Sequence, residues 1–153
     1  MSHIKQPTVF LLGLVFLFTG QLARADNMIM VRTTQTFPEA MAELQNQIRK
    51  KGYVVSRVQR VDIGLTKSGY KTDKYRVVFF GKPDEIRDLS RRYPQLTAYL
   101  PLKISIFAED RDTILVSANP QHLKKAGDAE LVKIIDRWER DMASIFRQIG
   151  SAE

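Results

Sequence analysis

Residues 75–80, YRVVFF, are the stretch that decides the fold. Aromatic and β-branched residues in such a run predict a β-strand. The strand is apolar on both faces, because consecutive side chains such as Phe79 and Phe80 point in opposite directions. A strand of this kind is usually covered on both faces. We therefore expect the last helix or another subunit to cover the second face, with Phe79, Phe80 and Phe107 as candidate interface residues.

Four more strands are predicted from runs rich in β-branched and apolar residues, at 28–33, 53–63, 102–106 and 113–118. The polar residues 109–112 separate the last two and predict a hairpin. Residues 64–73, GLTKSGYKTD, are polar and contain two glycines between two β-rich runs. This stretch is predicted to be a connection.

Helix signals lie between these strands. Thr36 and Glu39 have the spacing of a capping box, and Gly52 suits the left-handed end of a helix. A second helix is predicted to begin at Pro83, with two acids in its first turn, and to end before Pro94. A first helix and a second helix of moderate length are thus expected in the N-terminal two-thirds of the chain.

The last predicted helix is long. Between residues 128 and 149 the apolar positions alternate spacings of four and three. The complete order is β-α-β-β-α-β-β-α with short connections, which predicts an α+β domain. Its sheet is expected to be largely antiparallel, with helices packed on one face.

The first 25 residues predict export. Lys5 precedes a run of about ten apolar residues, which is too short to span a bilayer, and Ala23 and Ala25 suit signal peptidase. We expect a signal peptide over residues 1–25, cleavage after Ala25, and a periplasmic or secreted product. The mature chain, residues 26–153, is expected to form a single domain.

Composition excludes several kinds of chemistry. Residues 26–153 carry 22 Lys and Arg against 17 Asp and Glu, a net charge of +5. This modest excess suits anionic lipid or acidic partners, and the interspersed acids argue against nucleic acid. The chain has no cysteine, and His122 is the one histidine left after processing. We therefore expect no thiol chemistry, no multi-histidine metal site within one chain and no cofactor.

A set of short landmarks points to a known family. They are Gly69, FGKP at 80–83, YLPL at 99–102 and SANP at 117–120, and residues 37–54 supply a helix, glycine and strand upstream. Over most of residues 28–120 the chain resembles the DUF302 family. The resemblance implies a compact α+β domain, often dimeric, with no generally established reaction. Relatives often have histidine near Arg60 and cysteine where this chain has Leu102, so chemistry of those groups does not transfer.

Cations and one aromatic residue suggest a binding patch for a small anionic ligand, with candidates Arg60, Lys67, Tyr70, Lys74 and Lys82. The alternative interpretation is that these are ordinary charged side chains on strands and loops, exposed to solvent and without a ligand. For Lys82, between a strand and a helix, anion binding is weighed against helix initiation. We interpret the acidic residues Glu109, Asp110 and Asp112 as the tip of a hairpin. The alternative is that their carboxylates bind calcium.

These observations favour an exported, non-enzymatic binding or protein-interaction module, expected as a homodimer acting on a small ligand or an envelope protein. Two alternatives stay open. The first is a cofactor-free hydrolase or isomerase that uses carboxylates and His122, which requires an acid within hydrogen-bond reach of His122 in a cleft. The second is peripheral attachment to anionic lipid, which would weaken with salt.

Overall fold

The computed structural model describes residues 27–150, so the predicted signal peptide and its cleavage site lie outside the described residues. The elements in chain order are β1 (Met28–Thr33), α1 (Phe37–Lys50), β2 (Val54–Arg60), α2 (Val61–Lys67), β3 (Tyr75–Gly81), α3 (Pro83–Arg92), the 3₁₀ helix η1 (Pro94–Ala98), β4 (Leu102–Glu109), β5 (Asp112–Ala118), the 3₁₀ helix η2 (Pro120–Ala126) and α4 (Ala129–Gly150). The predicted order of strands and long helices is confirmed, with α2 as an addition.

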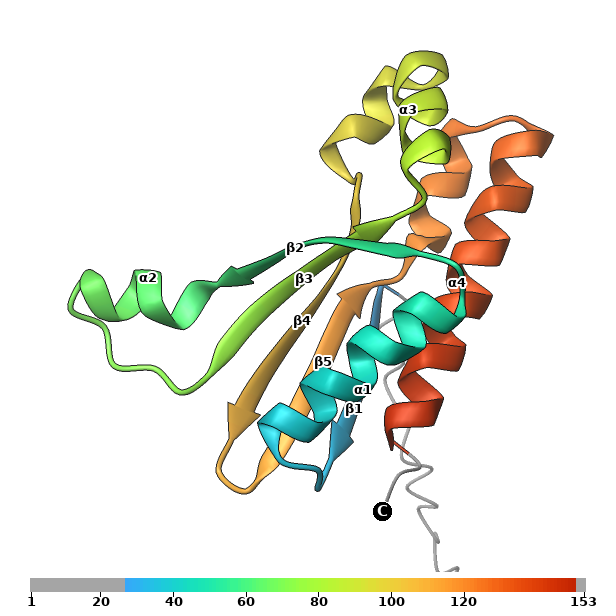
Figure 1. Cartoon of the computed structure of the whole chain (residues 1–153). Helices are drawn as coiled ribbons and strands as arrows, with labels where there is room; N and C mark the ends of the chain where they lie inside the picture. The colour runs from blue at the N-terminus through green and yellow to red at the C-terminus, as the bar shows by residue number, and fades with distance from the viewer. Residues whose placement is uncertain (1–26, 151–153) are drawn as a thin grey trace, which may run out of the picture.

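The five strands form one antiparallel sheet in the order β1-β5-β4-β3-β2. Because β1 and β2 are the two edges, α1 carries the chain across the whole sheet. Helix α4 packs against β1 and α1, so the two helices cover the same face (Figure 1). The α+β class and the single helical face are confirmed.

The core lies between this inner face and the helices. Val78 and Phe80 of β3 and Ile104 and Ile106 of β4 are fully buried. Helix α4 contributes the predicted apolar stripe, namely Leu131, Ile135, Trp138, Met142, Ile145 and Ile149, with Phe146 beside it. The long C-terminal helix therefore docks on its own sheet.

Strand β2 contains a bulge that the sequence did not reveal. The register with β3 shifts between Val55 and Arg57, and the Ser56 hydroxyl donates a hydrogen bond to the Phe79 carbonyl oxygen at 3.2 Å. The extra residue lets Val55 and Val58 both pack against the core although they are three positions apart.

The opposite, outer face of the sheet is not covered by any helix of residues 27–150 (Figure 1). Val77 and Phe79 of β3 and Phe107 of β4 are half-buried there, and Met30 of the edge strand β1 is 68% exposed. Phe80 is removed from the candidate interface, because its ring is fully buried in the chain's own core. The alternative in which the last helix covers this face is likewise overturned.

Helix α2 corrects two predictions. The second strand ends at Arg60 rather than at residue 63, and the predicted connection at residues 64–73 begins with the second half of this helix. Val61, Ile63 and Leu65 alternate as in a strand. However, the pairing of β2 with β3 ends at Arg60 and Arg76. Beyond that pair the backbone has no partner strand, so its polar groups bond locally in a helix.

We predict that Phe80→Ala lowers the free energy of unfolding by about 3–5 kcal/mol, because it leaves a cavity in the fully buried core. Urea unfolding followed by circular dichroism measures the change. Tyr70→Ala is the control, since Tyr70 is 66% exposed and its loss should cost under about 0.5 kcal/mol. Equal effects of the two substitutions would contradict this description of the core.

Candidate functional site

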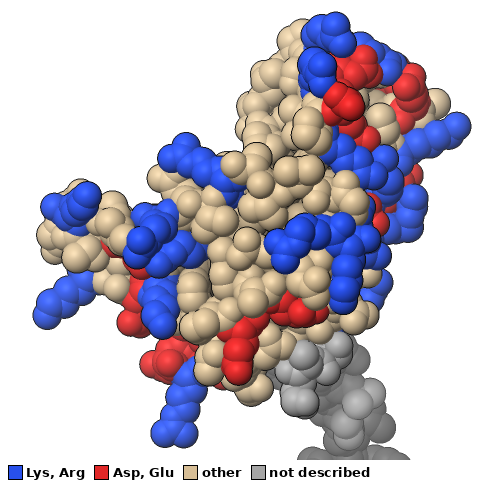
Figure 2. Space-filling view, viewed as in Figure 1, with Lys and Arg blue, Asp and Glu red and all other residues tan. Residues whose placement is uncertain are grey.

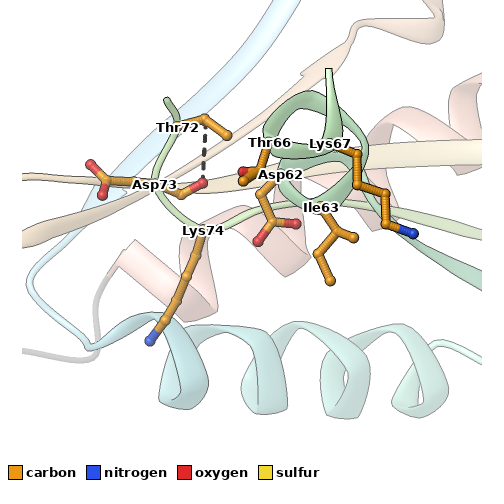
Figure 3. A pocket seen from close by; sticks show the side chains of 7 residues that line it. All are labelled: Asp62, Ile63, Thr66, Lys67, Thr72, Asp73 and Lys74. Atoms are coloured by element: carbon orange, nitrogen blue, oxygen red, sulfur yellow. Dashed lines mark hydrogen bonds between the residues drawn. The ribbon is translucent and has the colours of Figure 1, made fainter. Parts of the chain in front are cut away.

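A hollow beside the predicted basic patch lies between α2 and the segment that leads into β3. It is open, with a volume of about 620 Å³, and Figure 3 shows its lining: Asp62, Ile63, Thr66, Lys67, Thr72, Asp73 and Lys74. The predicted ligand residues Lys67 and Lys74 thus border one hollow. Tyr70 and Arg60 do not line it.

The two lysines do not converge. In Figure 3 the Lys67 and Lys74 side chains point in different directions, and Asp73 points away from both. The Lys74 ammonium lies 5.9 Å from the centre of the Phe37 ring on α1. A compact anion needs donors that point at one place, so this hollow is not built as a pocket for a small anion.

An ion pair fixes the base of α2. The Arg76 guanidinium on β3 donates to the Asp62 carboxylate, and both side chains are 15% exposed. This hydrogen bond holds the pKa of Asp62 below its usual range. Arg76 also lies over the Phe37 ring, at 5.8 Å from its centre. The pair joins the helix to the sheet and to the start of α1.

Lys82 is at the other end of β3 and does not join this patch. Its ammonium lies 5.2 Å from the centre of the Tyr53 ring, a cation–π contact. The neighbouring Pro83 begins α3, whose first turn already carries Asp84 and Glu85. The geometry at Lys82 supports helix initiation.

A polar cluster that sequence reasoning missed joins α3, α4 and Tyr53, the residue just before β2. The Tyr53 hydroxyl donates to Asp141 at 2.7 Å, and the Trp138 indole N–H donates to Glu85 at 3.0 Å. Arg137 also forms an ion pair with Glu85. Burial raises the pKa of Tyr53 well above its usual range, and the hydrogen bond to Asp141 adds to the shift. Apart from the buried Nε of Arg137, which has no hydrogen-bond partner among the described residues, these groups satisfy one another, as in a structural tie between elements.

His122 does not have the surroundings of a general base. Its Nδ1 donates to the main-chain oxygen of Asn119, and its ring packs edge-on against Tyr99 at 5.3 Å between centres. Among the described residues, no carboxylate is hydrogen-bonded to this imidazole. The adjoining cavity is only about 50 Å³ and is mostly apolar, with Leu102, Leu123 and Met142 among its residues.

The acidic turn between β4 and β5 is a hairpin tip, in agreement with the sequence. Asp110 has a positive φ of 53°, which suits a tight turn. Glu109 and Asp112 both accept hydrogen bonds from Arg32 on β1. Their oxygens are engaged with a guanidinium, so they stabilise the pairing of β1 with the hairpin.

The outer face is the remaining candidate surface. Across neighbouring strands, one row aligns Val77, Ser105, Val116 and Met30, and the next aligns Tyr75, Phe107, Ile114 and Arg32. The Tyr75 and Phe107 rings meet edge-to-face at 6.0 Å. An apolar face that spans four strands of a monomer is typical of an association surface.

Comparison with known proteins identifies the class of this fold. The family model "Domain of unknown function DUF302" matches residues 29–149, so the chain belongs to the DUF302 family. A crystal structure of an uncharacterized conserved DUF302 protein from Bacillus stearothermophilus is similar, with a TM-score of 0.72 and 18% identity. The match covers 82% of this chain and 99% of that one, and it supports the fold. No curated protein matches the chain.

Two further properties of residues 27–150 bear on the site. No helix in that range is long and apolar enough to cross a membrane. In the same range, no group of three or more His, Asp or Glu side chains is placed to hold a metal ion.

We predict that stability falls above pH 10 partly because of Tyr53. With its pKa raised in the folded protein, the phenol stays protonated there while the unfolded chain ionises at about pH 10. The free energy of unfolding should therefore drop by up to about 1.4 kcal/mol per pH unit from this group, and the drop should be smaller in Tyr53→Phe. Urea unfolding at pH 8 and above pH 10 measures it.

The control is Tyr70→Phe, which removes an exposed hydroxyl and should keep the wild-type pH dependence. If Tyr53→Phe and the wild type lose stability equally as the pH rises, Tyr53 is not the group responsible.

Proposed function

We propose that this chain is an exported, non-enzymatic protein-interaction module that works as a homodimer through the outer face of its sheet. The observation that carries the proposal is the apolar outer face, which no helix of residues 27–150 covers. Phe79, Phe107 and Val77 stand at its centre and are already half-buried, so enclosing each of them contributes only part of the about 1.5–3 kcal/mol that full burial of an exposed apolar side chain gives.

The composition of the face resembles that of an interface. Apolar side chains occupy its centre, while Arg57 and Gln59 on the edge strand β2 and Arg32 on the edge strand β1 lie at the ends of the rows, and Lys103 lies beside Phe79 on β4. Interfaces commonly combine an apolar core with a polar rim. The rim supplies hydrogen bonds, and the centre supplies the free energy of association.

A second copy of the chain is the partner that fits this face. A two-fold axis brings the same patch of each subunit together, so an apolar patch meets an apolar patch of equal size. Sheets that pack face to face do so through interdigitating apolar side chains, about 10 Å apart. The resemblance to a family whose members are often dimeric agrees with this partner.

The enzymatic alternative has less support. A hydrolase based on His122 requires an acid and a cleft beside the imidazole, whereas His122 bonds a main-chain oxygen next to a cavity of about 50 Å³. The interaction proposal needs only the face already described.

Phe79→Asp is predicted to convert the dimer to a monomer, because it places a charge at the centre of the apolar contact. Light scattering measures the mass, and circular dichroism should report an unchanged helix content. Val77→Lys is a second variant at the centre of the same face and should have the same effect. Gln95→Asp adds the same charge on the exposed η1 and serves as the matched control, which should remain dimeric.

Two results would count against the proposal. A wild-type protein that is monomeric at high micromolar concentration removes the homodimer. A Phe79→Asp protein that stays dimeric and equally stable removes the outer face as the contact surface.

A further inference from the structure

We propose that residues 57–76, here called the basic arm, dock on the surface of an anionic phospholipid bilayer. The basic arm comprises the end of β2, helix α2, the following segment and the start of β3. Arg57, Gln59 and Tyr75 at the two ends of the arm also belong to the outer face, whereas Lys67, Lys71 and Lys74 lie outside the sheet. The lysine site can therefore be tested independently of the homodimer proposed above.

Positive charge is concentrated on the basic arm. The basic arm holds six Lys and Arg against Asp62 and Asp73, a net charge of +4 in 20 residues. Residues 26–153 as a whole carry 22 Lys and Arg against 17 Asp and Glu, a net charge of +5. Nearly all of the excess positive charge therefore lies within these 20 residues, three of the cations on α2 and the segment after it and three on the adjoining strands, and the rest of the chain is close to neutral.

The central part of the basic arm is exposed to solvent. Helix α2 projects from the body beyond the end of the sheet (Figure 1), and residues 66–74 are exposed without interruption. Figure 2 shows lysine and arginine side chains gathered on this projection, with few acids among them. Within residues 27–150, Lys67, Lys71 and Lys74 form no ion pair, whereas Arg32, Arg92 and Arg137 are each paired with acids.

The directions of the lysines and the side chains between them suit an extended anionic surface. The lysines point in different directions, as Figure 3 shows for Lys67 and Lys74, which suits an extended charged surface rather than one compact ligand. Tyr70 is 66% exposed between Lys67 and Lys71, and Leu65 is half-exposed on α2. Tyrosine with an apolar ring and a polar tip favours the membrane–water interface. A soluble polyanion would gain little from these side chains.

The contribution of the three lysines to membrane binding can be calculated from their charge. Each lysine near an anionic membrane contributes about fivefold to binding, so three lysines together contribute about 100-fold. The attraction should decrease with salt, because the screening length falls from about 10 Å at 0.1 M to about 3 Å at 1 M.

The test uses vesicles of phosphatidylglycerol mixed with phosphatidylcholine, and vesicles of phosphatidylcholine alone. Sedimentation should show that the mature protein binds the first and not the second. The triple variant Lys67→Gln, Lys71→Gln, Lys74→Gln should bind about 100-fold more weakly. The matched control replaces Arg49, Lys50 and Lys51 at the end of α1 by Gln, which gives the same net charge and should leave binding unchanged.

A reporter distinguishes a membrane from other polyanions. In Tyr70→Trp the new indole is exposed, while Trp138 is only 1% exposed and gives a constant background. Its fluorescence should shift to the blue with phosphatidylglycerol vesicles and not with soluble polyphosphate.

Three results would overturn the proposal. The first is an equal loss of vesicle binding in the arm variant and the α1 control, which would mean that total charge alone matters. The second is absence of binding to phosphatidylglycerol vesicles at low salt. The third is tight binding to polyphosphate without any blue shift on vesicles, which would assign the arm to soluble polyanions. Because the outer face is not altered in these variants, none of these results bears on the homodimer.

Discussion

A single layer of helices covers only one face of the sheet, and the remaining features of the molecule depend on this constraint. Helices α1 and α4 bury Val78, Phe80 and Ile104 completely on the inner face. The strands alternate, so every inward side chain has an outward neighbour, and in β3 that neighbour is also apolar. The inner face therefore supplies most of the apolar burial on folding, while the outer face leaves apolar side chains half-buried or exposed.

Charged groups are paired differently in the body of the molecule and on the basic arm. In the body, charged groups meet partners across elements, as Glu85 does with Arg137 and Trp138, and these contacts hold α3 against α4. On the basic arm six cations repel one another against two acids, and among the described residues only Asp62 of these acids forms an ion pair, with Arg76. Repulsion of this kind destabilises a compact arrangement and is relieved when an opposite charge approaches.

Local signals in the sequence predict most of the fold. The capping-box residues Thr36 and Glu39 are hydrogen-bonded at 3.0 Å, Gly52 has a positive φ of 76°, and the stripe of α4 is buried. Features set by distant partners were not predictable. Helix α2 forms because β2 runs out of pairing, and the tie between Tyr53 and Asp141 joins residues 88 positions apart. For the same reason the sequence grouped Lys82 with Lys67, although the length of β3 separates them.

The position of β1 has a consequence for how the chain assembles. Strands β2 to β5 pair with neighbours in sequence, whereas β1 pairs with β5, from Met28 opposite Ala118 to Thr33 opposite Thr113. The first strand to leave the ribosome is thus the last to find its place, since its partner follows 80 to 90 residues later. Such a distant closure slows folding, and the sheet stays incomplete until β5 is available. A chain interrupted before β5 retains an unpaired edge, which favours intermolecular strand pairing.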